Sequence, residues 1–273
     1  IASGSAPGIS GITISLAHHG VDGLDSATRP RLCRVLYWVL KVIVVGPWLR
    51  VLFRPWTEGM DVLPRRGSAI VASNHLSFSD SFFLPLMTRR RITFLTKSDY
   101  FNGRGIKGLL TKAFFAGVGQ VPIDRSSGRA AEAAIATGVR MLRDRQLLGI
   151  YPEGTRTVDG RLYRGRVGVA RMALEAPAPV IPVAMVGTYE IQPPGKVRPR
   201  LGRVGIRFGP ILDFSRYEGM ESDRYILRSI TDEVVYTLME LSSQEYVDMY
   251  ATRAKQLKAD STNAALDGEA VSD

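Results

Sequence analysis

An isolated histidine, His75, and a carboxylate, Asp80, follow an apolar segment that is typical of a buried strand. Residues 68–84 read SAIVASNHLSFSDSFFL, so a predicted buried strand leads to His75, and Asp80 comes five residues later. A carboxylate that binds one ring nitrogen of a histidine fixes its tautomer, and the other nitrogen can then accept a proton. The pair therefore indicates general-base chemistry. The alternative is that Asp80 only caps the next helix while His75 packs nearby.

Charged residues also follow three other predicted strands. The segments are YPEGTRT (151–157), VPIDRSSG (121–128) and LTKSDY (95–100), with the cations Arg156, Arg125 and Lys97 and the carboxylate Glu153. Arginine can bind a phosphate through two parallel hydrogen bonds, and a helix N-terminus favours anions. Alone, each of the first two segments would be an ordinary ion pair or cap, and a lone lysine such as Lys97 is usually solvated. Together they predict a proton acceptor beside a phosphate-binding rim, whose positive charge keeps the pKa of the histidine low.

Strand-like and helix-like patterns alternate from residue 68 onward. The predicted strands are 68–73, 91–96, 118–123, 147–154 (ending in a loop), 180–187 and 202–209, and the predicted helices are 79–88, 108–117, 130–144, 166–176 and 222–258. This alternation is typical of an α/β domain with a mostly parallel central sheet flanked by helices. In such sheets, sites form beyond the carboxyl ends of the strands.

The segment before the core, residues 31–56, is apolar, basic and rich in tryptophan. Lys41 and Arg50 interrupt it, and Gly46-Pro47 should end or kink a first helix. A lysine near the centre of a membrane span costs roughly 2.5–3.5 kcal/mol. We therefore predict a helix lying at the membrane interface and a second short helix after Pro47, with a hairpin buried against the core as the alternative. All three tryptophans lie here, as interfacial anchors do: Trp38, Trp48 and Trp56.

Composition restricts the compartment and the partners. The net charge of +10 predicts attraction to polyanions, such as an anionic membrane or nucleic acid. Nucleic acid is disfavoured because the sequence carries no recognition-helix signature or stacked aromatic motif. The single cysteine, Cys33, excludes an internal disulfide framework and a cysteine-ligated zinc site. The leader, residues 1–30, is rich in glycine, serine and alanine and lacks the basic start of a secretory signal.

Four blocks of the sequence resemble, in order, those of the glycerolipid acyltransferase family. NHLSFSD resembles the NHxSxxD block, and VPIDR, YPEGTR and VIPVAM resemble the second, third and fourth blocks. Chance is a poor explanation for four ordered blocks, which lie within roughly residues 55–215. The best-known members of this family acylate 1-acylglycerol-3-phosphate to phosphatidic acid. Thr157 stands where serine is common, which does not threaten the chemistry.

The resemblance assigns a role to each site residue. His75 is implied to be the general base on the acceptor hydroxyl, which attacks an acyl thioester, and Asp80 orients it. The acceptor would be bound by Glu153, Gly154, Thr155 and Arg156, with Arg125 and Lys97 helping to hold its phosphate. Pro182, in the fourth block, would shape the site and the acyl groove. No metal or cofactor is implied, and the co-substrate is acyl-coenzyme A or acyl-carrier protein.

Three other functions are open to the sequence. Related bacterial acyltransferases acylate sugars such as lipid-linked mannosides, and glycerol-3-phosphate is another acceptor. The intact cations favour a phosphorylated glycerolipid. A non-catalytic membrane adaptor is disfavoured because every catalytic position is filled.

The expected organisation has four parts: a weakly structured leader (1–30), an interfacial membrane-binding helical segment (31–56), an α/β acyltransferase domain with a C-terminal helix (57–259) and a disordered tail (260–273). The expected location is the cytoplasmic face of the cell membrane, peripheral or monotopic, in contact with anionic lipids.

Overall fold

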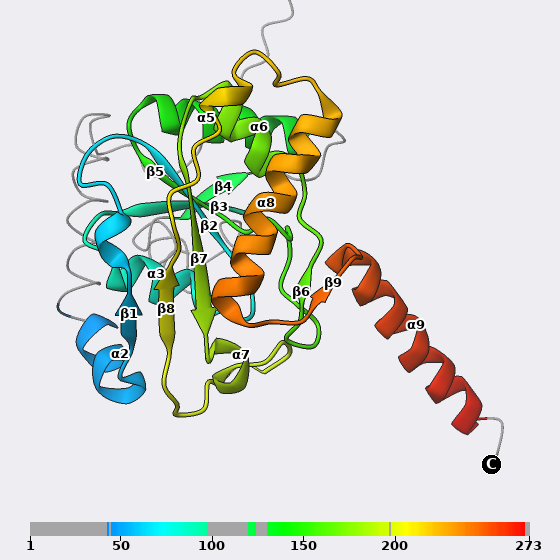
Figure 1. Ribbon diagram of the computed structural model, residues 1–273. Coiled ribbons are helices and arrows are strands. Elements are labelled where there is room, and N and C mark those ends of the chain that lie inside the picture. Colours follow the sequence, from blue (N-terminus) through cyan, green and yellow to red (C-terminus); the bar gives the residue numbers. More distant parts are fainter. Residues whose placement is uncertain (1–42, 44, 98–119, 124–129, 197, 271–273) are drawn as a thin grey trace, which may run out of the picture.

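The computed structural model describes residues 43, 45–97, 120–123, 130–196 and 198–270. Strands and helices alternate over most of the core (Figure 1). The strands are β1 Trp56–Glu58, β2 Ala69–Ser73, β3 Ile92–Lys97, β4 Gln120–Ile123, β5 Leu147–Ile150, β6 Leu162–Tyr163, β7 Val180–Val186, β8 Gly205–Phe208 and β9 Tyr246–Val247. The helices are α2 Val45–Phe53, α3 Asp80–Met87, α5 Ala130–Arg143, α6 Gly168–Glu175, α7 Thr188–Ile191, α8 Arg224–Ser242 and α9 Ala251–Ala270, with short 3-10 turns at Met60–Val62 and Ser215–Tyr217.

The main sheet has seven strands in the order β1-β8-β7-β2-β5-β3-β4. Neighbouring strands run parallel except β7 and β8, which are antiparallel. A second, two-stranded sheet pairs β6 with β9. The predicted α/β fold with a mostly parallel central sheet flanked by helices is therefore confirmed.

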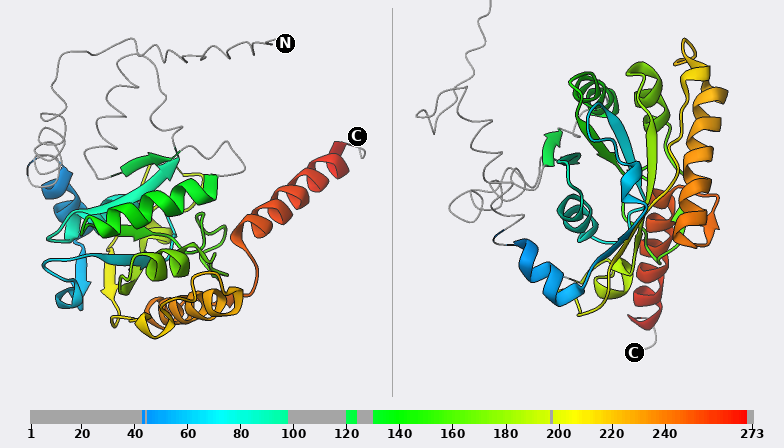
Figure 2. Two further views of the ribbon diagram at one scale, coloured as in Figure 1. Left: turned by 90° about the horizontal axis from the view of Figure 1, so that it is seen from above. Right: turned by 60° about the vertical axis from the view of Figure 1, so that its left-hand side comes forward.

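The two faces of the sheet bury separate apolar clusters, because successive side chains of a strand point to opposite faces. In β2, Ile70 and Ala72 join one cluster while Ala69 and Val71 join the other. The first cluster includes side chains of α5, α6 and α8, and the second includes side chains of α2, α3 and α7. Figures 1 and 2 show these two groups of helices on opposite sides of the sheet. All five residues of β2 are buried, as expected for a strand covered on both faces.

The strands that precede the predicted site residues are neighbours. β2 pairs with β5, β5 with β3, and β3 with β4, all in parallel. Their carboxyl ends therefore lie along one edge, which brings His75 after β2 beside the loop that follows β5. Lys97 is the last residue of β3. Arg125 and the predicted helix 108–117 lie outside the described residues.

Three predictions about the ends of the domain need correction. Trp56 is not part of a helical segment: it is the first residue of β1, pairs with Gly205, and lies under the guanidinium of Arg207 at 5.4 Å. The predicted helix 222–258 is interrupted after Ser242, where Ser243 takes a left-handed conformation with φ 59°, and β9 then pairs with β6. The tail predicted to be disordered from residue 260 is helical to Ala270.

Most of the predicted interfacial segment, residues 31–42 and 44, lies outside the described residues, as does the leader. The described part is α2, which begins at Val45 and has Gly46 and Pro47 in its first turn, where proline is tolerated. Phe53 of α2 is buried and packs edge-on against Phe83 of α3, with ring centroids 5.3 Å apart.

A stack of rings begins inside the sheet and leads to the site. Gly149 of β5 lies opposite Phe94 of β3, and a Cβ on Gly149 would come within 2.5 Å of the Phe94 ring. Phe94 is only 1% exposed, so its ring has little space in which to retreat. The Phe94 ring in turn stacks on Tyr151, with centroids 5.1 Å apart. Gly149 thus provides the space in which this stack forms.

We expect Gly149→Ala to lower the free energy of unfolding by roughly 1–3 kcal/mol, the usual cost of overpacking a core. Urea unfolding followed by circular dichroism measures the change. Gly168→Ala is the matched control, because Gly168 begins α6 and a Cβ there meets nothing closer than Met172 at 4.0 Å. Equal stability of the wild type and Gly149→Ala would show that the Phe94 ring is free to move.

Candidate active site

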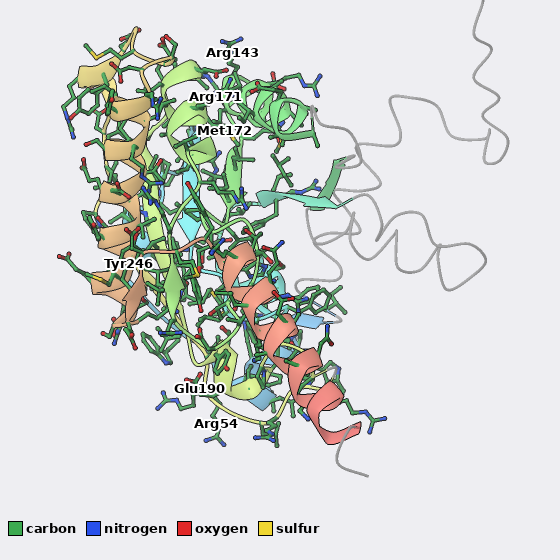
Figure 3. The ribbon with its side chains drawn as sticks, turned by 90° about the vertical axis from the view of Figure 1, so that its right-hand side faces the viewer. Arg54, Arg143, Arg171, Met172, Glu190 and Tyr246 are labelled. Carbon is green, nitrogen blue, oxygen red and sulfur yellow. The ribbon has the colours of Figure 1, made fainter. Side chains whose placement is uncertain are left out.

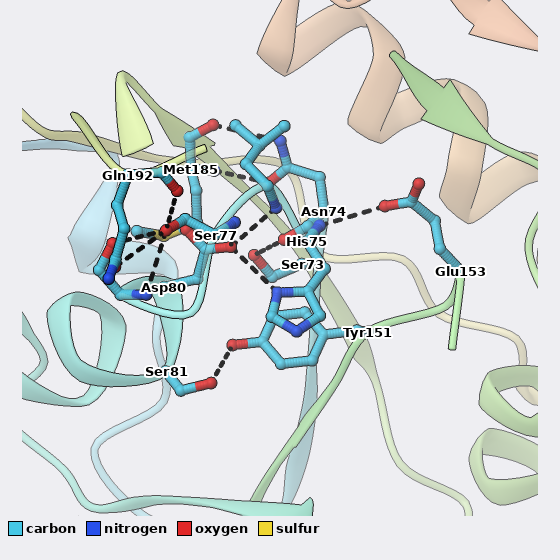
Figure 4. Close-up of polar contacts among 12 residues, drawn as sticks. Ser73, Asn74, His75, Ser77, Asp80, Ser81, Tyr151, Glu153, Met185 and Gln192 are labelled. Atoms are coloured by element: carbon cyan, nitrogen blue, oxygen red, sulfur yellow. Dashed lines mark hydrogen bonds and ion pairs between the residues drawn. The ribbon is translucent and has the colours of Figure 1, made fainter. Parts of the chain in front are cut away.

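One oxygen of Asp80 organises the loop between β2 and α3. Asp80 Oδ2 lies 3.0 Å from Nδ1 of His75 and accepts the backbone N–H groups of Leu76 at 2.8 Å and Ser77 at 2.7 Å (Figure 4). The N-cap of α3 is Ser79, which makes no side-chain capping bond. The Asp80 carboxylate therefore turns back to the histidine loop and does not cap its own helix, so the capping alternative is wrong.

The surroundings of His75 keep its imidazole neutral near pH 7. Its side chain is 15% exposed, and that of Asp80 is fully buried. Burial lowers the pKa of His75 below the ordinary 6.5, Asp80 opposes this, and the positive charges of Arg156 and Lys255 lower it further. Because a carboxylate only accepts hydrogen bonds, the neutral ring donates from Nδ1 to Asp80. Its Nε2 is then the atom able to accept a proton.

The plane of the His75 ring is set by an aromatic neighbour. The Tyr151 ring stacks on it with centroids 3.7 Å apart and an angle of 8° between the planes. The Tyr151 hydroxyl lies 3.1 Å from Oγ of Ser81, at the start of α3. Tyr151 thus bridges His75 to the ring of Phe94 behind it. Tyr151 is not among the site residues predicted from the sequence, although it directly precedes the PEGTR segment.

The backbone of His75 is held by the loop that follows β5. Its N–H donates to Oε1 of Glu153 at 3.1 Å, and its carbonyl accepts the N–H of Thr157 at 2.8 Å. The other oxygen of Glu153 accepts the N–H of Tyr163 at 3.0 Å. Burial raises the pKa of Glu153 to about 8. This geometry favours a positioning role for Glu153, since both of its oxygens already bind backbone amides.

Asn74, the residue before His75, fastens the end of β2 to β7. Its side-chain amide donates to the carbonyl of Met185 at 3.1 Å and accepts the Met185 N–H at 2.7 Å. These two bonds continue the β2–β7 pairing beyond Ser73, where β2 ends. The amide also donates to Gln244 at 2.6 Å. Asn74 opens the NHLSFSD block, but only the fold shows the two strand ends that it joins.

The other predicted residues of the 151–157 loop are at least partly exposed. Gly154 is exposed with φ 73°, a conformation that favours glycine, and a Cβ there would lie 2.9 Å from Arg166. The Thr155 hydroxyl accepts a hydrogen bond from Lys255. Arg156 is half-buried and close enough to influence the pKa of His75. Pro182 instead lies buried within β7, opposite Ala72, so its role in an acyl groove stays a prediction.

Within the described part of the chain, no group of three or more histidine, cysteine, aspartate or glutamate residues could hold a metal ion. The site chemistry visible there is that of a neutral imidazole oriented by a buried carboxylate, with the cations Arg156 and Lys255 close enough to lower its pKa. Such an arrangement can remove a proton from a hydroxyl group as that group attacks an electrophile.

Comparison with known proteins finds similarity to acyltransferases. Residues 55–186 match the Acyltransferase family model. The chain is 28% identical over 159 residues to a 1-acyl-sn-glycerol-3-phosphate acyltransferase of Limnanthes alba, covering 58% of this chain and 55% of that protein. It is 26% identical over 184 residues to the Bacillus subtilis protein of the same name, covering 67% and 85%. The chain thus spans about half the length of the plant relative.

The fold has a solved counterpart. The crystal structure of the 1-acyl-sn-glycerophosphate acyltransferase from Thermotoga maritima matches with a TM-score of 0.55 and 21% identity, covering 79% of this chain and 97% of that one. At this identity the match supports the fold. The matched residues 55–186 include all four sequence blocks that resemble the acyltransferase family.

We expect Asp80→Asn to lower the pKa of His75 further, because the carboxylate is the neighbour that raises it. An asparagine oxygen can still accept the N–H groups of Leu76 and Ser77, so the loop should be retained. Nuclear magnetic resonance titration of the histidine ring protons measures the pKa, with His18→Gln and His19→Gln introduced to leave one signal. A pKa of His75 that is unchanged or higher in Asp80→Asn would contradict this account.

Proposed function

We propose that this protein transfers a fatty acyl chain from an acyl thioester to the free hydroxyl of 1-acylglycerol-3-phosphate, giving phosphatidic acid for phospholipid synthesis. The observation that carries the proposal is the His75–Asp80 pair, with Nδ1 bound to the carboxylate and Nε2 left to accept a proton. The acyltransferase domain and the names of its relatives support the reaction and the acceptor.

In the proposed mechanism, Nε2 of His75 takes the proton of the acceptor hydroxyl as its oxygen attacks the thioester carbonyl. The bond between that carbonyl carbon and sulfur then breaks, and the leaving thiolate receives the proton back from the imidazolium. Asp80 stabilises the transient imidazolium and keeps the ring in one tautomer. General-base assistance of this kind contributes roughly 10²- to 10⁴-fold to the rate. Binding and orientation of the two substrates supply the remainder.

The cations favour a phosphorylated acceptor. Arg156 has no hydrogen-bond or ion-pair partner among the described residues, so its guanidinium is available for a phosphate. Lys97, at the end of β3, and Arg125 would complete the rim with Gly154 and Thr155. Glu153 would support this rim by holding the backbone of His75. A lipid-linked mannoside or another sugar acceptor is the alternative, and it needs fewer cations at the reacting end.

The acyl donor would be acyl-coenzyme A or acyl-carrier protein, with no further cofactor and no metal. The chemistry proposed for His75 needs only a thioester as electrophile. The groove for the acyl chain would run near Pro182 in β7.

We further propose that the protein works on the cytoplasmic face of the cell membrane. Within the described residues, no helix is both long and apolar enough to cross a bilayer. The helix α2 instead exposes Trp48 by 68% and Val51 by 72%, with the basic Arg50 between them. Exposed tryptophan and aliphatic side chains beside arginine are typical of helices that lie in the interface of an anionic membrane.

Replacement of the proposed base tests the reaction. We expect His75→Ala to lower kcat for acylation of 1-oleoylglycerol-3-phosphate by roughly 10²- to 10⁴-fold, because general-base assistance is lost. The assay follows labelled oleoyl-coenzyme A into phosphatidic acid, and the thermal unfolding midpoint shows that the variant remains folded. A folded His75→Ala protein with near wild-type turnover would end the mechanism. A wild type that prefers a mannoside lipid would favour the alternative acceptor.

Replacement of the exposed face of α2 tests membrane binding. We expect Trp48→Ser with Val51→Ser to weaken sedimentation with anionic liposomes by at least roughly tenfold, because buried apolar area is lost. Binding of the wild type should also fall at high salt, since charge attraction is screened. The control is Tyr225→Ser, because Tyr225 is 78% exposed but belongs to α8 on the other face of the sheet. Equal sedimentation of the double variant and the wild type would contradict this role for α2.

A further inference from the structure

The C-terminal segment beyond α8 is fastened to the loops of the site. β9 pairs with β6, Leu162 donates its N–H to the carbonyl of Glu245 at 2.9 Å, and Gln244 joins Asn74 to the carbonyl of Gly160. Figure 3 shows Tyr246 beside the lower turns of α8, and Figure 1 shows α9 extending away from the body of the protein. The C-terminal segment therefore reaches both the histidine loop and the strand that follows the 151–157 loop.

The first turns of α9 continue this attachment. Ala251 is fully buried, and Thr252 accepts a hydrogen bond from Arg166 at 3.2 Å. The Arg166 guanidinium also lies 5.3 Å from the centre of the Tyr250 ring. Lys258, nearly two turns further along, donates to the carbonyl of Val158 at 3.3 Å. The start of α9 thus lies along the 151–166 region, while its remaining turns project away (Figure 2).

Lys255 is the residue of α9 that enters the site. Its Nζ donates to the hydroxyl of Thr155, between Gly154 and Arg156 in the PEGTR segment. Its positive charge also lowers the pKa of both His75 and Glu153. Lys255 is partly buried, so its charge is less screened than that of a surface lysine.

We propose that Lys255 is a further acceptor-binding residue, which α9 places beside Thr155 so that its ammonium group binds the phosphate monoester of the acceptor together with Arg156. This inference rests on the proposed function. A phosphate monoester carries between one and two negative charges and three oxygens, so one arginine leaves oxygens to be bound. Lysine supplies a compact charge with three donors, and one of these can stay on Thr155 while another binds the ligand.

The phosphates of coenzyme A, which belong to the acyl donor, are also anions that the ammonium group of Lys255 can bind. The position of Lys255 favours the acceptor, because its partner Thr155 lies within the loop whose Arg156 and Gly154 are assigned to the acceptor phosphate. The kinetic experiment separates the two sources by varying each substrate while the other is saturating.

We expect Lys255→Met to raise KM for 1-oleoylglycerol-3-phosphate roughly tenfold, at the lower end for a hydrogen bond to a charged group, with KM for oleoyl-coenzyme A unchanged. Lys255→Arg should restore most of the loss. Arg253→Met is the matched control: it removes one positive charge from the same helix, and its exposed side chain makes no hydrogen bond or ion pair with any described residue. An unchanged acceptor KM in Lys255→Met, or a rise confined to the donor KM, would overturn the proposal.

A second readout does not depend on turnover. Removal of a nearby positive charge raises the pKa of a histidine, so the His75 pKa measured by nuclear magnetic resonance should rise in Lys255→Met and stay unchanged in Arg253→Met. If the wild type does not acylate lysophosphatidate, the proposed function fails, and the placement of Lys255 is judged by this titration. The same His75 pKa in the wild type and in Lys255→Met would overturn that placement.

Discussion

The hydrogen bonds that Asp80 accepts through one carboxylate oxygen determine the geometry of the site. The same Oδ2 binds the Nδ1 of His75 and the backbone N–H groups of two residues that follow it, in surroundings where Asp80 is fully buried. A buried carboxylate without such partners would be costly, so the loop is strongly favoured in the one conformation that supplies three donors. The orientation of the imidazole and the shape of the loop therefore depend on each other.

The central sheet makes this arrangement rigid. Asn74 binds Met185 at the end of β7, Glu153 binds the backbone of His75 from the end of β5, and the Tyr151 ring stacks on the imidazole. These contacts connect three adjacent strands to one histidine. Because strands buried on both faces move little relative to each other, the proton acceptor is held in place before any substrate binds, as catalysis by orientation requires.

The core of this account is predictable from sequence because it is local. His75 and Asp80 are five residues apart. The alternation of strands and helices also implies that the loops that follow the parallel strands lie along one edge of the sheet. Contacts between distant segments leave no such pattern. Lys255 and Thr155 are 100 residues apart, and the β6–β9 pairing and the contacts of the first turns of α9 bring them together. Trp56 was misassigned because tryptophan also occurs in strands, and the tail beyond residue 260 because its composition resembles that of disordered segments.

The most direct test of the account is the tautomer of His75 in the wild-type protein near neutral pH. Long-range nitrogen–proton correlation spectra of the imidazole distinguish a proton on Nδ1 from a proton on Nε2. The account predicts a neutral ring with its proton on Nδ1, hydrogen-bonded to Asp80, and an unprotonated Nε2. A ring protonated on Nε2 at neutral pH, either as the other tautomer or as a stable imidazolium, would contradict the role of His75 as the base.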